Sequence, residues 1–252
     1  MWWGQPFGVV LFRVRRHGDH VGDGCGPPRV IFGEVTGEGR GLTLGGVVLT
    51  VNGDRDAVER QLGNGELACP SCGGVLGRWG NAVTRPVRQL KGDDEVVTPR
   101  RSRCRGCRAT HVLLPAQLLS RRADAGAVIG RALEERAAGA GHRKIAGLLG
   151  RPESTVRGWL RALARGAGRV RERFTALAAS LVADPPLPAP AGSPLADAVA
   201  AVAAAAAAAV MLPGVGAVAR WELAAAVTCG LLLAPSWPAV KANASWLWAA
   251  AR

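Results

Sequence analysis

Two C-x-x-C pairs constrain the fold of this chain more than any other feature. They are C-P-S-C, from Cys69 to Cys72, and C-R-G-C, from Cys104 to Cys107, with 31 residues between them. Four thiolates complete the tetrahedral shell of zinc, which is typical of a structural rather than a catalytic metal site. The spacing therefore predicts that these four cysteines bind one zinc ion. The alternatives are four free thiols or a redox pair, but no thioredoxin-like βαβ pattern surrounds either pair.

The sequence around the cysteines predicts a small β zinc ribbon. Short apolar segments near 75–79, 82–90 and 95–103 are separated by turn signals. A segment this small and this charged has little apolar core, so we expect metal binding to supply much of its stability. His111 lies four residues after Cys107 and is an alternative ligand, but we expect it to be a surface residue. Glycines that give the turns backbone freedom flank the cysteines: Gly73, Gly74 and Gly106.

The residues before the ribbon divide into two parts. Residues 1–45 are rich in Gly and Arg without sustained periodicity, and we expect a poorly ordered N-terminal extension. From Val47 the sequence V-V-L-T-V alternates like a strand, and Asp54 is a plausible N-cap for a helix ending at Gly63. Residues 46–115 are therefore predicted to form a strand-helix lead-in and the ribbon.

Residues 116–183 are predicted to form a helix-turn-helix domain. From 142 to 165 the sequence reads HRKIAGLLGRPESTVRGWLRALAR. Gly150 is placed to end the first helix in the left-handed conformation, and Pro152 suits the first turn of the second. The first helix is expected to present an apolar face and one small residue for close packing: Ile145, Leu148, Leu149 and Ala146.

An upstream helix over about 124–138 completes a predicted tri-helical core. It contributes Val128, Ile129, Ala132 and Leu133, and the second helix of the motif contributes Val156, Leu160 and Leu163. This is the geometry that sets a recognition helix in the major groove, where arginine reads guanine and hydroxyls suit phosphates. The alternative is an ordinary helical hairpin with a solvated basic face. The predicted DNA contacts are Arg143, Lys144, Arg151, Glu153, Ser154, Thr155, Arg157, Arg161 and Arg165.

The charge of the chain is concentrated in the segment that holds both motifs. Residues 69–173 carry 22 basic and 8 acidic side chains, whereas residues 1–68 carry 7 and 8 and residues 174–252 carry 3 and 3. A GC-rich genome favours Arg over Lys, but codon bias does not explain this segregation. Such a segment attracts a polyanion through counterion release.

The order of these motifs resembles two families. C-x-x-C, a β spacer, C-x-x-C-x-x-x-H-V-L-L-P and then I-A-G-L-L-G-R-P-E-S-T-V-R-G-W-L is similar to the N-terminal DNA-binding part of certain insertion-sequence transposases. It looks even more like a family of short proteins from high-GC, actinobacterial-type bacteria that keep the zinc ribbon and helix-turn-helix but lack the nuclease. The likeness covers about residues 47–240. It implies a mobile-element or regulatory DNA-binding role, without a demonstrated activity.

The C-terminal part is expected to be helical. Residues 184–194 read as a stiff Pro-rich linker, and residues 195–252 as a region with an alanine helix over about 195–212 and a second helix near 220–233. The uncharged stretch 198–219 is long enough to span a bilayer, so a membrane-tethered regulator is an alternative. Alanine gains little in lipid, and we expect instead a helical pair that docks on the protein or forms a homodimer. Its contact is expected to involve Trp221, Trp237, Trp246 and Trp248.

Together these features predict an α+β protein that binds double-stranded DNA and has no catalysis of its own. Beyond the helix-turn-helix only Asp184, Asp197 and Glu222 are acidic, too few in the wrong context for a two-metal nuclease. Transposition, with a separate transposase as partner, or transcription regulation are the expected roles. The opening Met1-Trp2-Trp3-Gly4 lacks the basic start of a signal peptide, so we expect a cytoplasmic protein with reduced cysteines.

Two further alternatives remain at this point. A protein-interaction adaptor would bind DNA only weakly and without regard to sequence. Binding to RNA or to single-stranded DNA is disfavoured, because Trp79 is the only aromatic residue in the ribbon and leaves little stacking surface.

Overall fold

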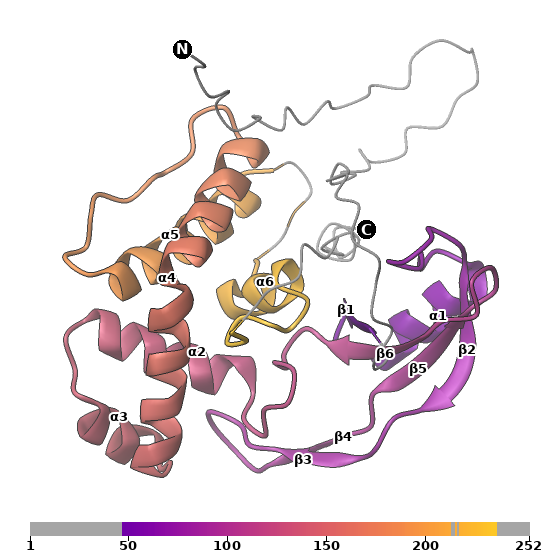
Figure 1. The fold of residues 1–252 in the computed structure, drawn as a ribbon, viewed down its shortest axis with the longest axis horizontal. Helices are drawn as coiled ribbons and strands as arrows, with labels where there is room; N and C mark the ends of the chain where they lie inside the picture. The colour runs from indigo at the N-terminus through magenta and orange to yellow at the C-terminus, as the bar shows by residue number, and fades with distance from the viewer. Residues whose placement is uncertain (1–46, 213–214, 216, 236–252) are drawn as a thin grey trace, which may run out of the picture. The chain divides into compact units, whose positions relative to one another are not determined.

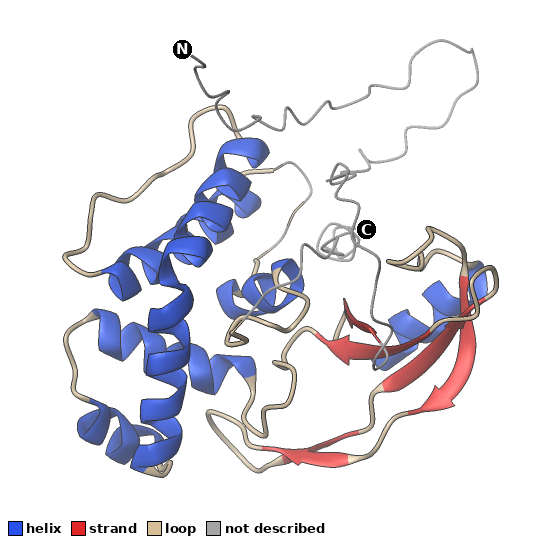
Figure 2. Ribbon diagram, in the orientation of Figure 1, coloured by secondary structure: helices blue, strands red, loops and turns tan. Residues whose placement is uncertain are grey.

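The computed structural model describes residues 47–212, 215 and 217–235. The predicted N-terminal extension, residues 1–45, lies outside this part of the chain, as do Trp237, Trp246 and Trp248. Figures 1 and 2 show that the strands belong to the first part of the described chain and that helices dominate the second. The predicted α+β fold class is confirmed.

Four strands form the main sheet of the ribbon region, in the order β1-β6-β5-β2. β1 and β6 run parallel, and the other neighbours are antiparallel. A separate two-stranded sheet pairs β3 with β4. The strands are β1 (Val47–Val51), β2 (Leu76–Asn81), β3 (Arg85–Val87), β4 (Glu95–Val97), β5 (Arg100–Cys104) and β6 (Thr110–Pro115).

The strand prediction for 95–103 is wrong in one respect. This segment divides into β4 and β5, which belong to different sheets, and Pro99 lies between them. A proline cannot donate a backbone hydrogen bond to a ladder, so it marks the change of partner. β6 is a further strand that pairs with both β1 and β5.

Helix α1 (Arg55–Asn64) covers one face of the main sheet, beside β2. The Asp54 side chain accepts a hydrogen bond from the backbone N–H of Asp56 at 2.9 Å, so the predicted N-cap is confirmed. The helix ends slightly later than predicted, where Gly65 adopts a φ of 71°. The core between α1 and the sheet consists of Leu49, Val51, Val58, Leu62, Leu67, Cys69, Leu76, Cys104 and Leu113.

Three helices form the predicted tri-helical arrangement: α2 (Gly126–Ala137), α3 (His142–Leu149) and α4 (Glu153–Leu181). Ile145, Val156 and Leu163 are buried at its centre together with the predicted residues of α2. Trp159 is also buried, although the sequence analysis did not place it in the core. The expectation for Leu148 is wrong, because this side chain is 57% exposed.

Helices α5 (Pro194–Val210) and α6 (Arg220–Val227) pack on this arrangement. The Ser193 hydroxyl caps α5 by accepting from the backbone N–H of Ala196 at 3.2 Å, and Pro194 opens the first turn. Most alanines of α5 are buried against α4, which small side chains allow to approach closely. The docking of the alanine helix on the rest of the protein is confirmed. Within the described residues, no helix combines the length and apolar character needed to cross a bilayer.

Candidate metal centre and nucleic-acid interface

The four cysteines converge on one point, although β2 to β5 separate the two pairs along the chain. Their sulfur atoms all lie within 4.8 Å of one another. The Sγ atoms of Cys72 and Cys104 are 3.4 Å apart, and those of Cys69 and Cys107 are 3.7 Å apart. A tetrahedral zinc ion with Zn–S bonds of about 2.3 Å requires sulfur–sulfur distances of about 3.8 Å. The cluster can therefore hold a metal ion.

Backbone turns direct the first pair of sulfurs inward. The N–H of Gly73 donates to the carbonyl of Cys69 at 2.8 Å, and the N–H of Cys69 donates to the carbonyl of Gly74 at 2.7 Å. Gly73 has a φ of 74°, so the predicted need for glycine freedom is confirmed there. Gly74 has another role, because a Cβ atom on it would lie 3.1 Å from the sulfur of Cys104. Its hydrogen leaves room for the thiolates.

Proximity of the sulfur atoms shifts the pKa values of Cys72 and Cys107 in opposite directions. A backbone hydrogen bond from Gly74 and the neighbouring thiols lower the pKa of Cys72 to about 6. The amide of Ala109 acts in the same direction on Cys107, but the neighbouring Cys72 raises the pKa of Cys107 to about 12. Close sulfurs cannot all ionise without a cation, and a metal ion removes this conflict.

His111 contradicts the expectation of a surface residue. It lies on β6, is only 1% exposed, and its Nε2 is 3.3 Å from the Sγ of Cys69. An imidazole in this place is suited to donating a hydrogen bond to a metal-bound thiolate. The signal in the sequence was the four-residue spacing from Cys107. What the spacing could not reveal is that β6 turns this side chain toward the sheet face that α1 covers.

The turn between α3 and α4 has the conformation that the sequence predicts. Gly150 has a φ of 61°, and its N–H donates back to the carbonyls of α3. Pro152 lies one position earlier than expected, at the N-cap of α4, so Glu153 is the first helical residue. No side chain caps this N-terminus. A helix N-terminus with free N–H groups is a favourable place for a phosphate.

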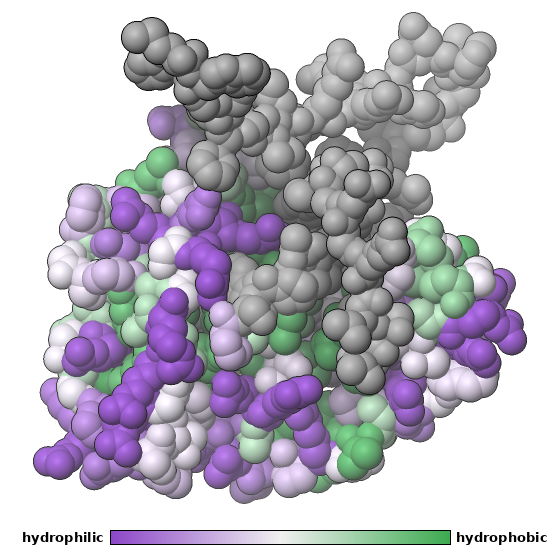
Figure 3. Space-filling model, viewed as in Figure 1, coloured by the Kyte–Doolittle hydropathy of each residue, from purple (hydrophilic) through white to green (hydrophobic). Residues whose placement is uncertain are grey.

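The first half of α4 presents a basic face. Arg157, Arg161 and Arg165 recur every four residues and are exposed, and none of them forms an ion pair with any described residue. Figure 3 shows hydrophilic side chains gathered in a band over α3 and this part of α4. The structure therefore brings together most of the predicted DNA contacts on one exposed surface: Lys144, Arg143, Ser154, Thr155, Arg157, Arg161 and Arg165.

Three predicted DNA contacts have partners within the protein: Arg151, Glu153 and Arg143. Arg151 Nε donates to the carboxylate of Asp124 at 2.6 Å, and its guanidinium also reaches the carbonyls of Leu149 and Gln89. These internal bonds hold Arg151 against the turn and occupy its guanidinium within the protein. Glu153 lies 3.5 Å from Arg143 in an exposed ion pair.

Asp124 joins the ribbon region to the helix-turn-helix. Its carboxylate, 3% exposed, accepts from Arg151 and also from Arg88 at 3.1 Å. The backbone of Arg88 bonds to both neighbours of Asp124, accepting from Ala125 at 3.0 Å and donating to Ala123 at 2.8 Å. The residues next to β3 are thereby fixed to the start of α2 and to the turn before α4.

Comparison with known proteins gives one match. Residues 69–159 are similar to a family described as a domain of unknown function, DUF6431. The match begins at the first cysteine of the cluster and ends at Trp159, so it includes all four cysteines and Arg157 but not Arg161 and Arg165. Searches of the curated proteins and of the solved structures found no match.

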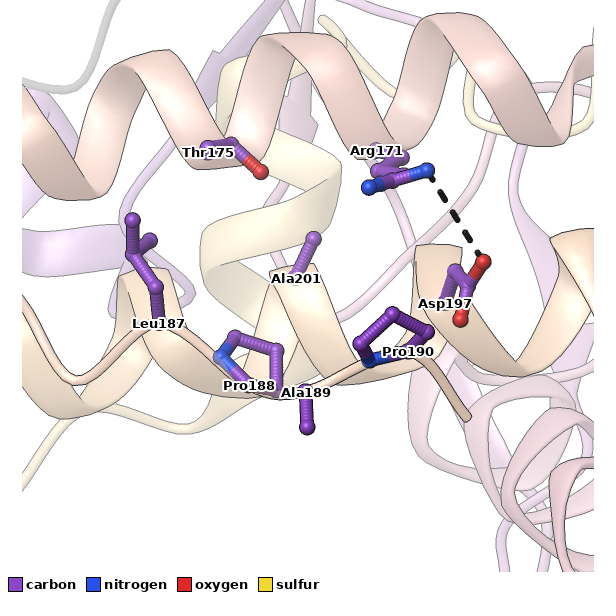
Figure 4. Close-up of a pocket in the computed structure, with 8 residues that line it drawn as sticks. All are labelled: Arg171, Thr175, Leu187, Pro188, Ala189, Pro190, Asp197 and Ala201. Carbon is purple, nitrogen blue, oxygen red and sulfur yellow. Dashed lines mark ion pairs between the residues drawn. The ribbon is translucent and has the colours of Figure 1, made fainter. Parts of the chain in front are cut away.

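The pocket between α4, α5 and the preceding linker is small. Figure 4 shows Leu187, Pro188 and Pro190 along its edge, with the ion pair of Arg171 and Asp197 at one end. Its volume is about 120 Å³, well below the several hundred Å³ typical of small-molecule sites. The cysteine cluster and the basic surfaces are therefore better candidates for a binding site than this pocket.

Proposed function

We propose that the protein binds double-stranded DNA, with α4 as recognition helix in the major groove and a zinc ion holding the ribbon. The observation that carries this proposal is the row of Arg157, Arg161 and Arg165 on the exposed half of α4. Arginines that lack acidic partners are available for guanine edges and phosphates. The uncapped start of α4, at Pro152, offers its N–H groups to a phosphate in the same region.

The metal has a supporting role in this proposal. Zinc is the metal that four cysteine thiolates at this separation fit best, and it would bind without taking part in a reaction. Because Asp124 and Arg88 fix the ribbon to the helix-turn-helix, a folded ribbon would help to position α4. The protein would act in the cytoplasm by binding, with no catalysis of its own.

The resemblance to transposase N-terminal regions gives the proposal its biological context. We infer a role in transposition or in transcription regulation, with a separate transposase or a second copy of the chain as the protein partner. The family match over residues 69–159 is compatible with either role, since the family has no stated function.

The test is fluorescence anisotropy of the full-length protein on a selected pool of DNA duplexes, across a salt series. We expect saturable, sequence-selective binding. The logarithm of the association constant should fall linearly with the logarithm of salt concentration. Arg157→Ala should weaken binding to the selected duplex by about tenfold to a hundredfold and relax selectivity at one base position. A chelator should reduce binding as well.

Arg173→Ala is the matched control, since Arg173 is exposed on the same helix but lies outside the predicted contacts. It should change affinity less than Arg157→Ala does. Binding that selects no sequence and vanishes at physiological salt would overturn the proposal and favour a protein-interaction adaptor.

A further inference from the structure

The face of the main sheet opposite α1 carries a second group of basic residues. Strand alternation places Ser102 and Cys104 toward α1, where both are buried, and Arg101 and Arg103 on the opposite face. Near β1, this opposite face is covered: Thr50 donates to the carbonyl of Ala225, at the end of α6. Toward β5 and β2 the arginines are part-exposed.

Trp79 lies on β2 at a break in the ladder. The register shifts between Arg78, which pairs with Ser102, and Gly80, which pairs with Arg101, so Trp79 is the extra residue of a β-bulge. Gly80 has a φ of 114°, a conformation that favours glycine. Leu76 and Arg78 face α1, so strand alternation places Trp79 on the opposite face, with Arg103. Trp79 is 52% exposed there, which is unusual for the largest apolar side chain.

Arg103 covers one face of the Trp79 ring. Its Cζ lies 4.5 Å from the ring centroid, and its Nε donates to the carbonyl of Arg108 at 3.2 Å, which holds the guanidinium in place. None of four arginines in this area forms an ion pair with an acidic residue in the part of the chain that the structure describes. They are Arg101, Arg103, Arg105 and Arg108.

We propose that this face binds single-stranded DNA, with one unpaired base stacked on Trp79 and the flanking phosphates on Arg101, Arg103 and Arg105. An aromatic ring beside a row of cations is the arrangement by which proteins hold single strands without reading their sequence. The Arg103 guanidinium on Trp79 adds a cation–π contact and leaves the rest of the ring for a base. The inference goes beyond the proposed function, since it adds a single-strand site on a different part of the protein from the α4 arginines.

A single aromatic residue in the ribbon argued against single-strand binding at the level of sequence. The structure changes this expectation, because that one ring is exposed and has cations next to it. One exposed ring can stack one base. Contacts between the arginines and the phosphates on either side of that base supply the remaining affinity.

The experiment compares two probes on the full-length, zinc-loaded protein by fluorescence anisotropy. One is a labelled single strand of about twelve nucleotides, within the site size of a small single-strand-binding module. The other is the duplex of the selected sequence. Trp79→Ala should weaken single-strand binding by about tenfold to a hundredfold, the effect of one stacked base, and leave duplex binding unchanged. Trp79→Phe should retain most of the single-strand affinity.

Arg103→Ala should weaken single-strand binding as well, whereas Arg60→Ala should not. Arg60 is a matched control because it is exposed on α1, which covers the other face of the sheet. Circular dichroism and zinc content of each variant identify any that fails to fold. Trp79 is half exposed, so its truncation leaves the core intact, and Trp79→Phe provides a second, milder variant.

The two proposals fail in different ways. If Trp79→Ala binds the single strand as tightly as the unaltered protein does, the single-strand site is overturned while selective duplex binding can still stand. If no duplex is selected but the single strand is bound through Trp79, the recognition-helix proposal fails and this one survives. A ribonucleotide strand of the same sequence distinguishes the source: tighter binding of RNA than of DNA would overturn the assignment to DNA.

Discussion

The ribbon region and the helical region of this protein are held together by different physical means. The apolar core beneath the main sheet consists of nine residues, and two of them, Cys69 and Cys104, belong to the metal centre. The helical region buries whole faces of α2, α4 and α5, including Phe174 at the contact side of α4. We expect a small β domain with so little apolar surface to depend on the proposed metal, whereas a helical arrangement of this size can fold on apolar burial.

This difference predicts how loss of the metal would affect each of the two proposed functions. The recognition helix belongs to the region with its own apolar core, and its orientation depends on the ribbon through Asp124. The proposed single-strand face belongs to the region that depends on the metal. Loss of metal should therefore abolish the function of the ribbon face and loosen, without unfolding, the helix-turn-helix.

The largest expected effect comes from removing the metal. A chelator, or Cys104→Ser, should unfold the ribbon, because metal binding contributes on the order of 10 kcal/mol in small zinc domains. Hydrogen exchange should show lost protection in β5 and β6 while α4 and α5 remain protected. Ser71→Ala is the control within the same knuckle, since Ser71 is exposed and should leave the metal content unchanged. Equal loss of protection in both regions would refute the comparison.

The second effect is confined to the helical region. Phe174→Ala removes a fully buried ring and should lower the free energy of unfolding by about 3–5 kcal/mol. Denaturant unfolding of the zinc-loaded protein measures this change, and zinc content should stay at the level of the unaltered protein. A variant that loses its zinc would show that the two cores are not separable.

The third effect tests the ion pairs of Asp124, which join the ribbon region to the helix-turn-helix. Asp124→Asn leaves two arginines without their carboxylate, and breaking a buried ion pair in this way costs about 3 kcal/mol. The measurement is the midpoint of thermal unfolding, with Glu135→Gln as control. Glu135 pairs with Arg131 on the surface of α2 and should contribute less than about 0.5 kcal/mol. Similar midpoints of thermal unfolding for the two variants would mean that the ion pairs of Asp124 do not stabilise the junction.

The fourth effect concerns the metal centre without touching its ligands. His111→Ala should weaken zinc binding by about 10- to 100-fold, because a hydrogen-bond partner of a metal-bound thiolate tunes the site. Competition with a chromogenic chelator measures the affinity. His142→Ala, on α3, should leave it unchanged, and an unchanged affinity for the His111 variant would mean that this imidazole only fills space.

The smallest expected effect is that of Leu148→Ala on the exposed side of α3, with Ile145→Ala as its buried comparison. Ile145→Ala should cost about 2–5 kcal/mol, since the side chain is fully buried. Leu148→Ala should change the free energy of unfolding by less than about 0.5 kcal/mol, because the side chain is exposed. Both are measured by denaturant unfolding, and a large cost at Leu148 would restore the prediction that it belongs to the core.

Several features were predictable because they depend on a few neighbouring residues. The Asp54 cap, the Gly150 turn, the Gly73 conformation and the limits of α2 follow from local backbone preferences. The cysteine cluster also follows from local spacing, since each C-x-x-C forms its own turn. The strands between the two pairs only need to bring these turns together. The α+β class follows in turn from the β spacer and the helical periodicity after it.

Other features were not predictable because they depend on contacts between distant segments. The place of Arg151 in the turn predicts a DNA contact, and only the tertiary structure shows that Asp124 accepts a hydrogen bond from it. His111 looked like a surface residue until β6 placed it against Cys69. Leu148 fitted the apolar periodicity of α3, but the short helix meets its neighbours with Ile145 and Ala146 instead.

The sequence by itself determined the cysteine spacing, the charged segment and the periodic arginines of α4, because each is set by residue type and short-range spacing. Only the tertiary structure decided which polar residues are used up inside the protein and which remain for a ligand. That decision depends on the pairing of strands and helices far apart in the chain. Trp79 is the clearest case: the pairing of β2 with β5 brings Arg103 over the single aromatic ring of the ribbon, which stays 52% exposed.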